Sequence, residues 1–397
     1  MQFSGRNRPK NDWFGAALGV ALLLLVLIGA AASIPGANAQ SAALPDVPKV
    51  TAKAVFSIDV SAGVVLMAQN PDKELSPAST TKIFTALVVV NNANLDDPVI
   101  IDAQDTFQTG ESTMGLVAGD TLTVEDLLYG LMLPSGNDAA RSLARYVGGL
   151  LLVKDGAENG DPTARFVDEM NREVDSLGLK HSHFTNPDGL DQKGLYSSAR
   201  DLATAAAALL QNKTLAKIVG TPAKDVTSIG ETPATYSLAN TNVMLTDGSH
   251  PDVQGVKTGG TSVAGGCLVL ATWAKGENHI ITVVLGSDIS YDASDKIVDG
   301  SDKRYEDTQT VLKALQQDYV WLNAEVPGLD AELAAWQVSL STKAKVVVRK
   351  SAANDLKYLL QLGPAGKTNA QVGQVLFFIG SEQVAARPVV QLKTSGG

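Results

Sequence analysis

Strand-like segments stand at both ends of the region from about residue 50 to 320, and helix-like segments fill its middle. The apolar runs 54–59 and 64–68 flank a short turn, and the runs 267–274 and 279–286 flank another, which is typical of two hairpins. Helical spacing of apolar residues predicts helices over 79–91, 124–133, 138–147, 162–177, 198–211 and 304–319. This order favours an α+β fold in which one antiparallel sheet unites the two ends of the region.

The pattern changes beyond about Asn323. Short strand-like runs divided by Gly, Pro and Asn follow, at 338–340, 346–348, 358–362, 375–379 and 389–392. They predict a small all-β domain of about 70 residues. We therefore expect a larger α+β domain over 40–323 and a small C-terminal β domain over 324–397.

Residues 1–39 have the pattern of an export signal. Three of the first ten residues are basic, the apolar run 14–32 follows, and Ala37-Asn38-Ala39 predicts cleavage before Gln40. The run is also long enough to span a bilayer core of about 30 Å, so an uncleaved N-terminal anchor is the alternative. In both cases we expect an exported protein at the periplasmic or extracellular face of the cytoplasmic membrane, with no other attachment to the membrane.

Composition excludes several classes of function. The 42 acidic side chains outnumber the 32 basic ones, giving a net charge of −10, whereas nucleic-acid binding by counterion release needs a basic surface. The four histidines and Cys267 show no zinc-ligand spacing, so we expect no bound metal. We also expect no other cofactor, and the acidic net charge predicts no nucleic-acid partner. Cys267 is expected in the core, and His181 and His183 in turn or surface roles.

Ser79 and Lys82 are the first candidates for catalytic residues. A spacing of three at a helix start puts two side chains on one face, with Cβ atoms about 5–6 Å apart. A serine becomes a good nucleophile when a neighbouring base takes its proton, and a lysine with a lowered pKa can be that base. The alternative is an N-cap serine followed by a solvated lysine.

Two further segments carry suitable groups. Ser135-Gly136-Asn137 lies between two predicted helices, where a short loop can aim a hydroxyl and a carboxamide into a cleft, although helix capping explains the same residues. Lys257-Thr258-Gly259-Gly260 lies at the edge of the second predicted hairpin. There a lysine can attract a carboxylate, and glycines let a substrate approach the main chain; the alternative is a solvated turn.

The motifs Ser-x-x-Lys, Ser-x-Asn and Lys-Thr-Gly, in this order, resemble those of penicillin-binding proteins and serine β-lactamases. The flanking residues are similar to low-molecular-mass penicillin-binding proteins of the serine-type D-alanyl-D-alanine carboxypeptidase family, from about residue 45 to 320. The segments that carry this resemblance are 77–82, 133–139, 183–191, 197–202 and 255–259, with 374–375 and 386–390 similar to the end of that family's C-terminal β domain. The resemblance implies a β-lactamase/transpeptidase-like domain followed by a small β domain.

The resemblance also implies a reaction. Ser79 would attack the carbonyl between the two terminal D-alanines of a peptidoglycan stem peptide, Lys82 would accept its proton, and Ser135 would relay a proton to the leaving amine. Asn137 would hold the substrate amide. Water would then hydrolyse the acyl-enzyme, and β-lactam antibiotics would acylate Ser79 as covalent inhibitors.

Substrate binding is implied for the third motif. Lys257 and Thr258 would bind the terminal carboxylate, next to Gly259. The backbone N–H groups of Ser79 and Gly260 would form the oxyanion hole, a role that suits Ser79 because N–H groups at a helix start have no intrahelical partner.

The sequence departs from relatives at a few positions. Gly260 and Asp188 stand where some relatives have histidine, and no C-terminal amphipathic helix for membrane attachment is visible. Arg304 resembles an arginine found near the site in the family, with a surface ion pair as the alternative.

Two other functions stay open. A serine β-lactamase needs fast deacylation, for which class A members use a glutamate-held water, and Glu169 lies in a predicted amphipathic helix instead. A non-catalytic penicillin-sensing or wall-binding protein would not need intact Ser79, Lys82 and Ser135.

Overall fold

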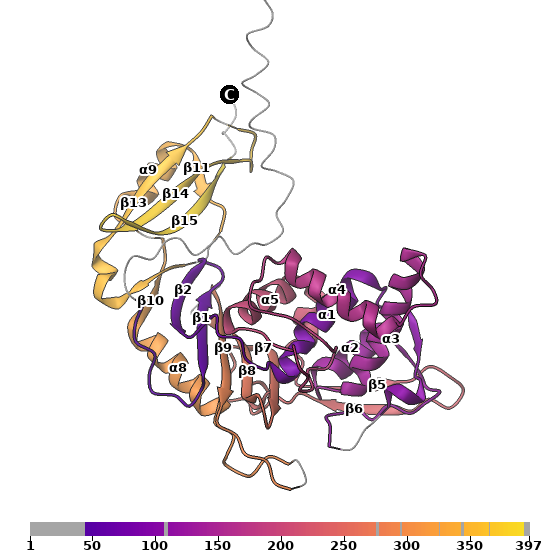
Figure 1. Ribbon diagram of the computed structural model, residues 1–397. Helices are drawn as coiled ribbons and strands as arrows, with labels where there is room; N and C mark the ends of the chain where they lie inside the picture. The colour runs from indigo at the N-terminus through magenta and orange to yellow at the C-terminus, as the bar shows by residue number, and fades with distance from the viewer. Residues whose placement is uncertain are drawn as a thin grey trace, which may run out of the picture. The chain divides into compact units, whose positions relative to one another are not determined.

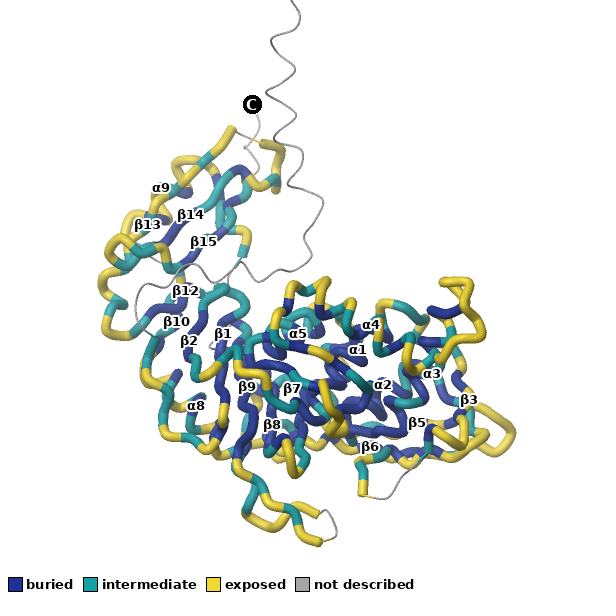
Figure 2. The backbone as a smooth tube through the Cα atoms, viewed as in Figure 1, coloured by how far each residue is buried: buried dark blue, intermediate teal, exposed yellow. Residues whose placement is uncertain are grey.

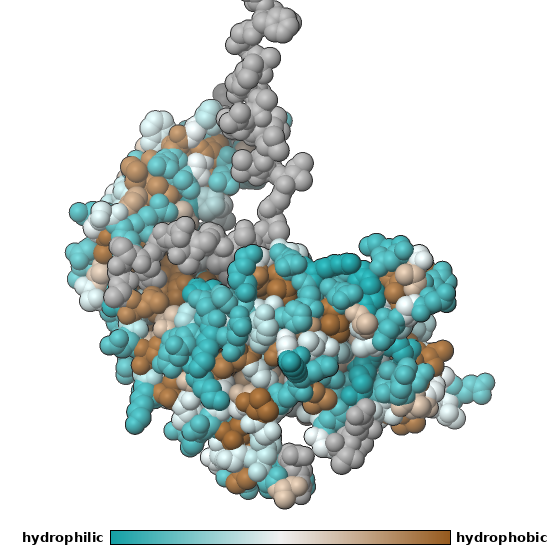
Figure 3. Space-filling model, in the orientation of Figure 1, coloured by the Kyte–Doolittle hydropathy of each residue, from teal (hydrophilic) through white to brown (hydrophobic). Residues whose placement is uncertain are grey.

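The computed structural model describes residues 44–106, 110–274, 278–293, 296–324, 326–342, 345–364 and 366–392 (Figure 1). The predicted leader over 1–39 lies outside these residues. Within them, no helix combines the length and apolar content that a membrane crossing needs. On the face drawn in Figure 3, hydrophobic residues are scattered among hydrophilic ones, as on ordinary protein surfaces.

A five-stranded antiparallel sheet holds the larger region together. Its order is β2 (Val64–Gln69), β1 (Ala54–Asp59), β9 (Asn278–Ser287), β8 (Gly265–Ala274) and β7 (Val253–Thr261). Val55 in β1 lies opposite Val284 in β9. The first hairpin therefore pairs with the last one, and the predicted α+β fold with a sheet uniting both ends is confirmed.

The sheet is covered on both faces, as Figure 2 shows by the dark blue of its strands. All six residues of β1 are buried, and they alternate between two cores because successive strand residues point to opposite faces. Phe56 and Ile58 pack in a core with helices from the middle of the chain, whereas Val55 packs with Val311 and Leu315. The last two belong to α8 (Arg304–Asp318), so α8 lies on the opposite face from the helical region.

The helical region contains six α-helices: α1 (Lys82–Asn92), α2 (Val124–Met132), α3 (Asn137–Asp155), α4 (Pro162–Ser176), α5 (Ala199–Gln211) and α6 (Lys213–Val219). A short helix α7 (Val243–Thr246) precedes β7. Two small hairpins that periodicity did not predict join the helices: β3 (Pro98–Ile100) with β4 (Thr121–Thr123), and β5 (Ala223–Thr227) with β6 (Thr235–Ala239).

Helix α3 extends well past the predicted end at residue 147. The predicted segment ends before the pair Gly148-Gly149, and glycine is a poor helix former. In the structure, a Cβ on Gly148 would lie 1.8 Å from the backbone oxygen of Pro162, the first residue of α4. Gly148 is therefore a packing glycine that lets α4 approach α3, and the helix continues through it.

The C-terminal region contains a four-stranded antiparallel sheet with its own core. Its order is β11 (Val338–Leu340), β15 (Glu382–Gln391), β14 (Gln371–Ile379) and β13 (Leu356–Leu362), while β10 (Tyr319–Leu322) pairs with β12 (Val346–Arg349). A short helix α9 (Leu329–Ala335) and a 3-10 turn η3 (Lys350–Asp355) accompany the strands. The predicted β region is thus present, with these two helical turns added.

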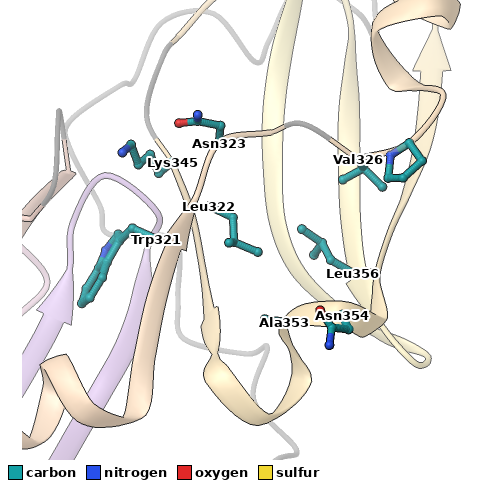
Figure 4. A pocket seen from close by; sticks show the side chains of 9 residues that line it. Trp321, Leu322, Asn323, Val326, Lys345, Ala353, Asn354 and Leu356 are labelled. Atoms are coloured by element: carbon teal, nitrogen blue, oxygen red, sulfur yellow. The ribbon is translucent and has the colours of Figure 1, made fainter.

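Strand β10 lies between two cores. Tyr319 and Trp321 pack in the core of the larger region, whereas Val320 and Leu322 pack against the C-terminal core. Leu322 also lines a cavity of about 520 Å³ with Leu356 and Asn354 of the C-terminal region (Figure 4). This cavity contains none of the site residues expected from the sequence.

Asp59 is the centre of a buried polar cluster next to strand β10. Its carboxylate accepts hydrogen bonds from Asn278 Nδ2 at 2.7 Å, Trp321 Nε1 at 2.9 Å and the backbone N–H of Ala62 at 2.8 Å. Asn278 also exchanges hydrogen bonds with the backbone of Lys345, at 2.6 and 3.1 Å. Burial raises the pKa of Asp59, and the three donors and the charge of Arg387 lower it in part.

We predict that Asp59→Ala destabilises the protein, because two buried side-chain donors and one partly buried N–H would lose this acceptor. The expected loss is about 2–3 kcal/mol of unfolding free energy in urea. Asp59→Asn keeps one oxygen acceptor and should lose less. Equal stability of Asp59→Ala and the unsubstituted protein would contradict this role.

Candidate active site

Ser79 lies in the 3-10 turn η1 (Ala78–Thr81), which leads directly into α1. The N-cap residues of η1 and α1 are Pro77 and Thr81, so Ser79 is not a helix cap. Ala78, just before it, has a φ of +47° in the left-handed region that residues with a Cβ rarely adopt. Strained backbone of this kind clusters at functional sites.

Lys82 is fully buried and not solvated. Its Nζ donates to Ser79 Oγ at 3.0 Å, to Asn137 Oδ1 at 2.7 Å and to the backbone oxygen of Asp188 at 2.6 Å. Burial lowers the pKa of Lys82 to about 8, while the Asp188 and Glu111 carboxylates oppose that shift. An amine with this pKa can both give and accept a proton near neutral pH.

The second motif forms the turn between α2 and α3. Ser135 is buried and has a φ of +63°, again in the left-handed region. The N-cap of α3 is Gly136, which has no side chain to cap with, so the capping explanation of this motif is wrong. Asn137 is the first residue of α3, and its amide lies between Lys82 and Glu111.

The third motif lies in the edge strand β7 and is largely buried, so the solvated-turn alternative is wrong. Lys257 Nζ donates to the backbone oxygen of Thr258 at 3.0 Å, and Thr258 Oγ1 lies 2.6 Å from Thr241 Oγ1. Burial lowers the pKa of Lys257, and the positive charges of Lys82 and Arg304 lower it further. Two other positively charged side chains, Lys82 and Arg304, therefore lie close enough to Lys257 to disfavour its charged form.

Gly259 allows β7 to lie against the turn that carries Ser79. A Cβ at this position would lie 3.0 Å from the backbone nitrogens of Ser79 and Thr80 and 3.1 Å from the backbone oxygen of Pro77. A side chain here would have to displace backbone, so glycine sets the distance between the first and third motifs.

A cavity of about 220 Å³ opens over Ser79. Asn137, Gly260 and Tyr291 contribute to its walls, and so do segments 110–112 and 189–191. A Cβ on Gly260 would lie 2.7 Å from Tyr291 Oη and 3.0 Å from Arg304 Nη2. The space that a side chain at 260 would need is therefore occupied by these two groups.

Comparison with known proteins agrees with this geometry. The family model described as D-alanyl-D-alanine carboxypeptidase matches residues 39–289, more than half of the chain. The chain belongs to this family. It is a hydrolase of the penicillin-binding protein group.

Individual relatives of this family extend the comparison. The chain is 35% identical over 260 residues to a D-alanyl-D-alanine carboxypeptidase of Streptomyces sp. (strain K15), covering 62% of this chain and 85% of that protein. It is 29% identical over 373 residues to D-alanyl-D-alanine carboxypeptidase DacA of Escherichia coli, covering 88% and 85%.

Two solved structures have the same fold as this chain. The Streptomyces K15 DD-transpeptidase has a TM-score of 0.57 at 31% identity, covering 68% of this chain and 99% of that one. Penicillin binding protein 5 from Haemophilus influenzae has a TM-score of 0.62 at 25% identity, covering 88% and 98%. The second match includes the C-terminal region and is consistent with the fold expected from the resemblance.

Arg304 is buried, whereas the alternative was an ion pair at the surface. It is 5% exposed, pairs with Asp302 at 2.7 Å and donates from Nη1 to the backbone oxygen of Gly259 at 2.5 Å. It therefore supports β7 beside Gly260.

Sequence reasoning missed Glu111, Arg141 and Tyr291. Glu111 and Tyr291 line the Ser79 cavity without belonging to a motif. Arg141 follows Asn137 by four residues in α3, and this helical spacing is the one local signal that pointed to it.

The other residues considered from the sequence make packing or ion-pair contacts. Cys267 is buried, and the ring of His183 stacks on Tyr196. Glu169 forms ion pairs with Arg165 and Arg172. Among the described residues, no group of three His, Cys, Asp or Glu side chains could hold a metal ion.

We predict that Gly259→Ala slows labelling by a fluorescent penicillin about tenfold or more, because its Cβ would push β7 away from η1. The matched control is Gly149→Ala, since a Cβ there has no heavy atom within 4 Å. An unchanged labelling rate in Gly259→Ala would refute the importance of this contact.

Proposed function

We propose that this chain is a serine-type D-Ala-D-Ala carboxypeptidase that removes the terminal D-alanine from peptidoglycan stem peptides through an acyl-enzyme on Ser79. The observation that supports it best is the 3.0 Å contact between Ser79 Oγ and the fully buried amine of Lys82. A base in this position can activate a serine.

In this mechanism, neutral Lys82 takes the proton of Ser79 as Oγ attacks the carbonyl between the two D-alanines. The backbone N–H groups of Ser79 and Gly260 stabilise the oxyanion. Ser135 relays the proton to the leaving amine, free D-alanine departs, and water then hydrolyses the ester. A β-lactam acylates Ser79 by the same attack.

Substrate binding falls to Asn137 in the wall of the cavity and to residues of the neighbouring strand β7. Asn137 holds the substrate amide, and Lys257 and Thr258 bind the terminal carboxylate beside Gly259. The lowered pKa of Lys257 supports this role, because an arriving carboxylate would favour its charged form.

We further infer an exported enzyme of peptidoglycan synthesis and cell-shape maintenance. The leader over 1–39 directs export, 40–323 form the peptidase domain and 324–397 a small β domain. The separate apolar core of the C-terminal region supports this division, and β10, whose residues alternate between that core and the core of the larger region, lies at the boundary. A retained leader would be the membrane attachment. No observation favours the β-lactamase or the sensor over the peptidase.

The direct test is release of free D-alanine from a diacyl-Lys-D-Ala-D-Ala peptide by the full chain and by Ser79→Ala. We expect release by the unsubstituted protein and none by the variant. Rapid hydrolysis of nitrocefin would favour the β-lactamase instead. Penicillin labelling of Ser79 without D-alanine release would favour the sensor.

We predict that acylation by penicillin rises with pH and levels off above about pH 8, the pKa of Lys82. Below that pH the amine is protonated and cannot accept the serine proton, so each pH unit should cost about tenfold. The measurement is the second-order labelling rate against pH. A rate independent of pH would rule out Lys82 as the base.

A further inference from the structure

Arg141 and Glu111 form a buried ion pair beside the candidate active site. Arg141 Nη1 lies 2.9 Å from Glu111 Oε2, and Nη2 lies 2.6 Å from Oε1, so the pair is bidentate. The side chains are 16% and 4% exposed. Arg141 also donates to the backbone oxygens of Asp105 and Thr106, at 3.2 and 2.9 Å. These contacts fix the orientation of the Glu111 carboxylate.

Glu111 in turn fixes the amide of Asn137. Asn137 Nδ2 donates to Glu111 Oε2 at 2.9 Å, and its Oδ1 accepts from Lys82 Nζ at 2.7 Å. An ionised carboxylate accepts hydrogen bonds and does not donate them, so it selects the amide orientation in which Nδ2 faces Glu111 and Oδ1 faces Lys82. The reversed amide would place a donor against the Lys82 amine.

Arg141 also lies near Asp188, which supplies the main-chain acceptor of Lys82. Its Nη1 lies 3.9 Å from Asp188 Oδ2, and the backbone oxygen of Asp188 accepts from Lys82 at 2.6 Å. The two residues that supply these acceptors, Asn137 and Asp188, therefore both neighbour the Arg141–Glu111 pair.

We propose that Glu111 and Arg141 are positioning residues that hold the Asn137 amide, and through it the Lys82 amine, in the geometry that activates Ser79. The inference rests on the proposed role of Lys82 as the base. It assigns a function to two residues outside the three motifs.

A direct role of Glu111 is the competing explanation, because Glu111 lines the Ser79 cavity and could act on the deacylating water. Its two oxygens already accept three hydrogen bonds, from Arg141 and Asn137. A carboxylate held in this way suits alignment better than proton transfer.

The charge of Glu111 adds a second effect. Lys82 faces the carboxylates of Asp188, Glu111 and Asp138, which raise its pKa, and the guanidinium of Arg141, which lowers it. Lys257 is a further cation close enough to be affected by Lys82. Removing the Glu111 charge should therefore lower the pKa of Lys82 and move the pH inflection of acylation below that of the unsubstituted protein.

The experiment compares Glu111→Ala with Glu111→Gln in the full chain, using penicillin acylation rates over about pH 6 to 10. For Glu111→Ala we expect the plateau rate to fall about 10- to 100-fold and the inflection to move to lower pH. Glu111→Gln retains an oxygen that can accept from Asn137. It should recover most of the plateau rate while keeping the lowered inflection.

The matched control is Glu169→Ala, which also removes a glutamate paired with arginines but lies outside the cavity. It should change neither the plateau nor the inflection. A Glu111→Ala protein with both values unchanged would overturn the proposal. The proposal would also be overturned if Glu111→Ala lowered the melting temperature and the active fraction but left the acylation rate per active site unchanged. The same holds if the substitution slowed deacylation alone. Failure of the unsubstituted protein to label at Ser79 would instead contradict the proposed function.

Discussion

The burial of the Lys82 ammonium is the constraint on which the arrangement of the site depends. Lowering the pKa from 10.5 to about 8 corresponds to about 3 kcal/mol against the charged form in the folded protein near neutral pH. The ammonium form has three N–H donors, and three neutral oxygens accept from it, on Ser79, Asn137 and Asp188. Loss of one acceptor would leave a buried charged donor unpaired, so the three segments that carry them must stay together.

The sheet supplies the other half of the site. Residues 54–59 of β1 pair with residues 280–285 of β9, and β8 and β7 follow β9 in the sheet. This pairing joins the late strands of the larger region to the early segment that leads to η1. Gly259 then lets two backbones meet at a separation at which a Cβ would lie 3.0 Å from backbone nitrogens of η1. Arg304 extends from the helix on the opposite face to the backbone of the same strand.

The sequence predicted those parts of this arrangement that depend on local spacing. The hairpins, the long helices and the Ser79–Lys82 contact follow from period two, period 3.6 and a separation of three residues. The contacts from Lys82 to Asn137 and Asp188 span 55 and 106 residues, and no local pattern encodes them. Family resemblance supplied Asn137, but it supplied neither Glu111 nor Arg141. The three-residue strands β3 and β4 are too short for their alternation to be distinguished from loop sequence.

Two buried lysines in one site also bear on which peptides it would accept in the proposed mechanism. The charge on Lys82 lowers the pKa of Lys257, so protonating one amine opposes protonating the other. A free carboxylate at Lys257 would offset this repulsion, whereas the neutral amide of an internal peptide bond would not. The same carboxylate would bring negative charge near Lys82 as Ser79 reacts. If Lys257 binds the substrate as proposed, the electrostatics around it would therefore favour cleavage of a terminal residue over cleavage within a chain.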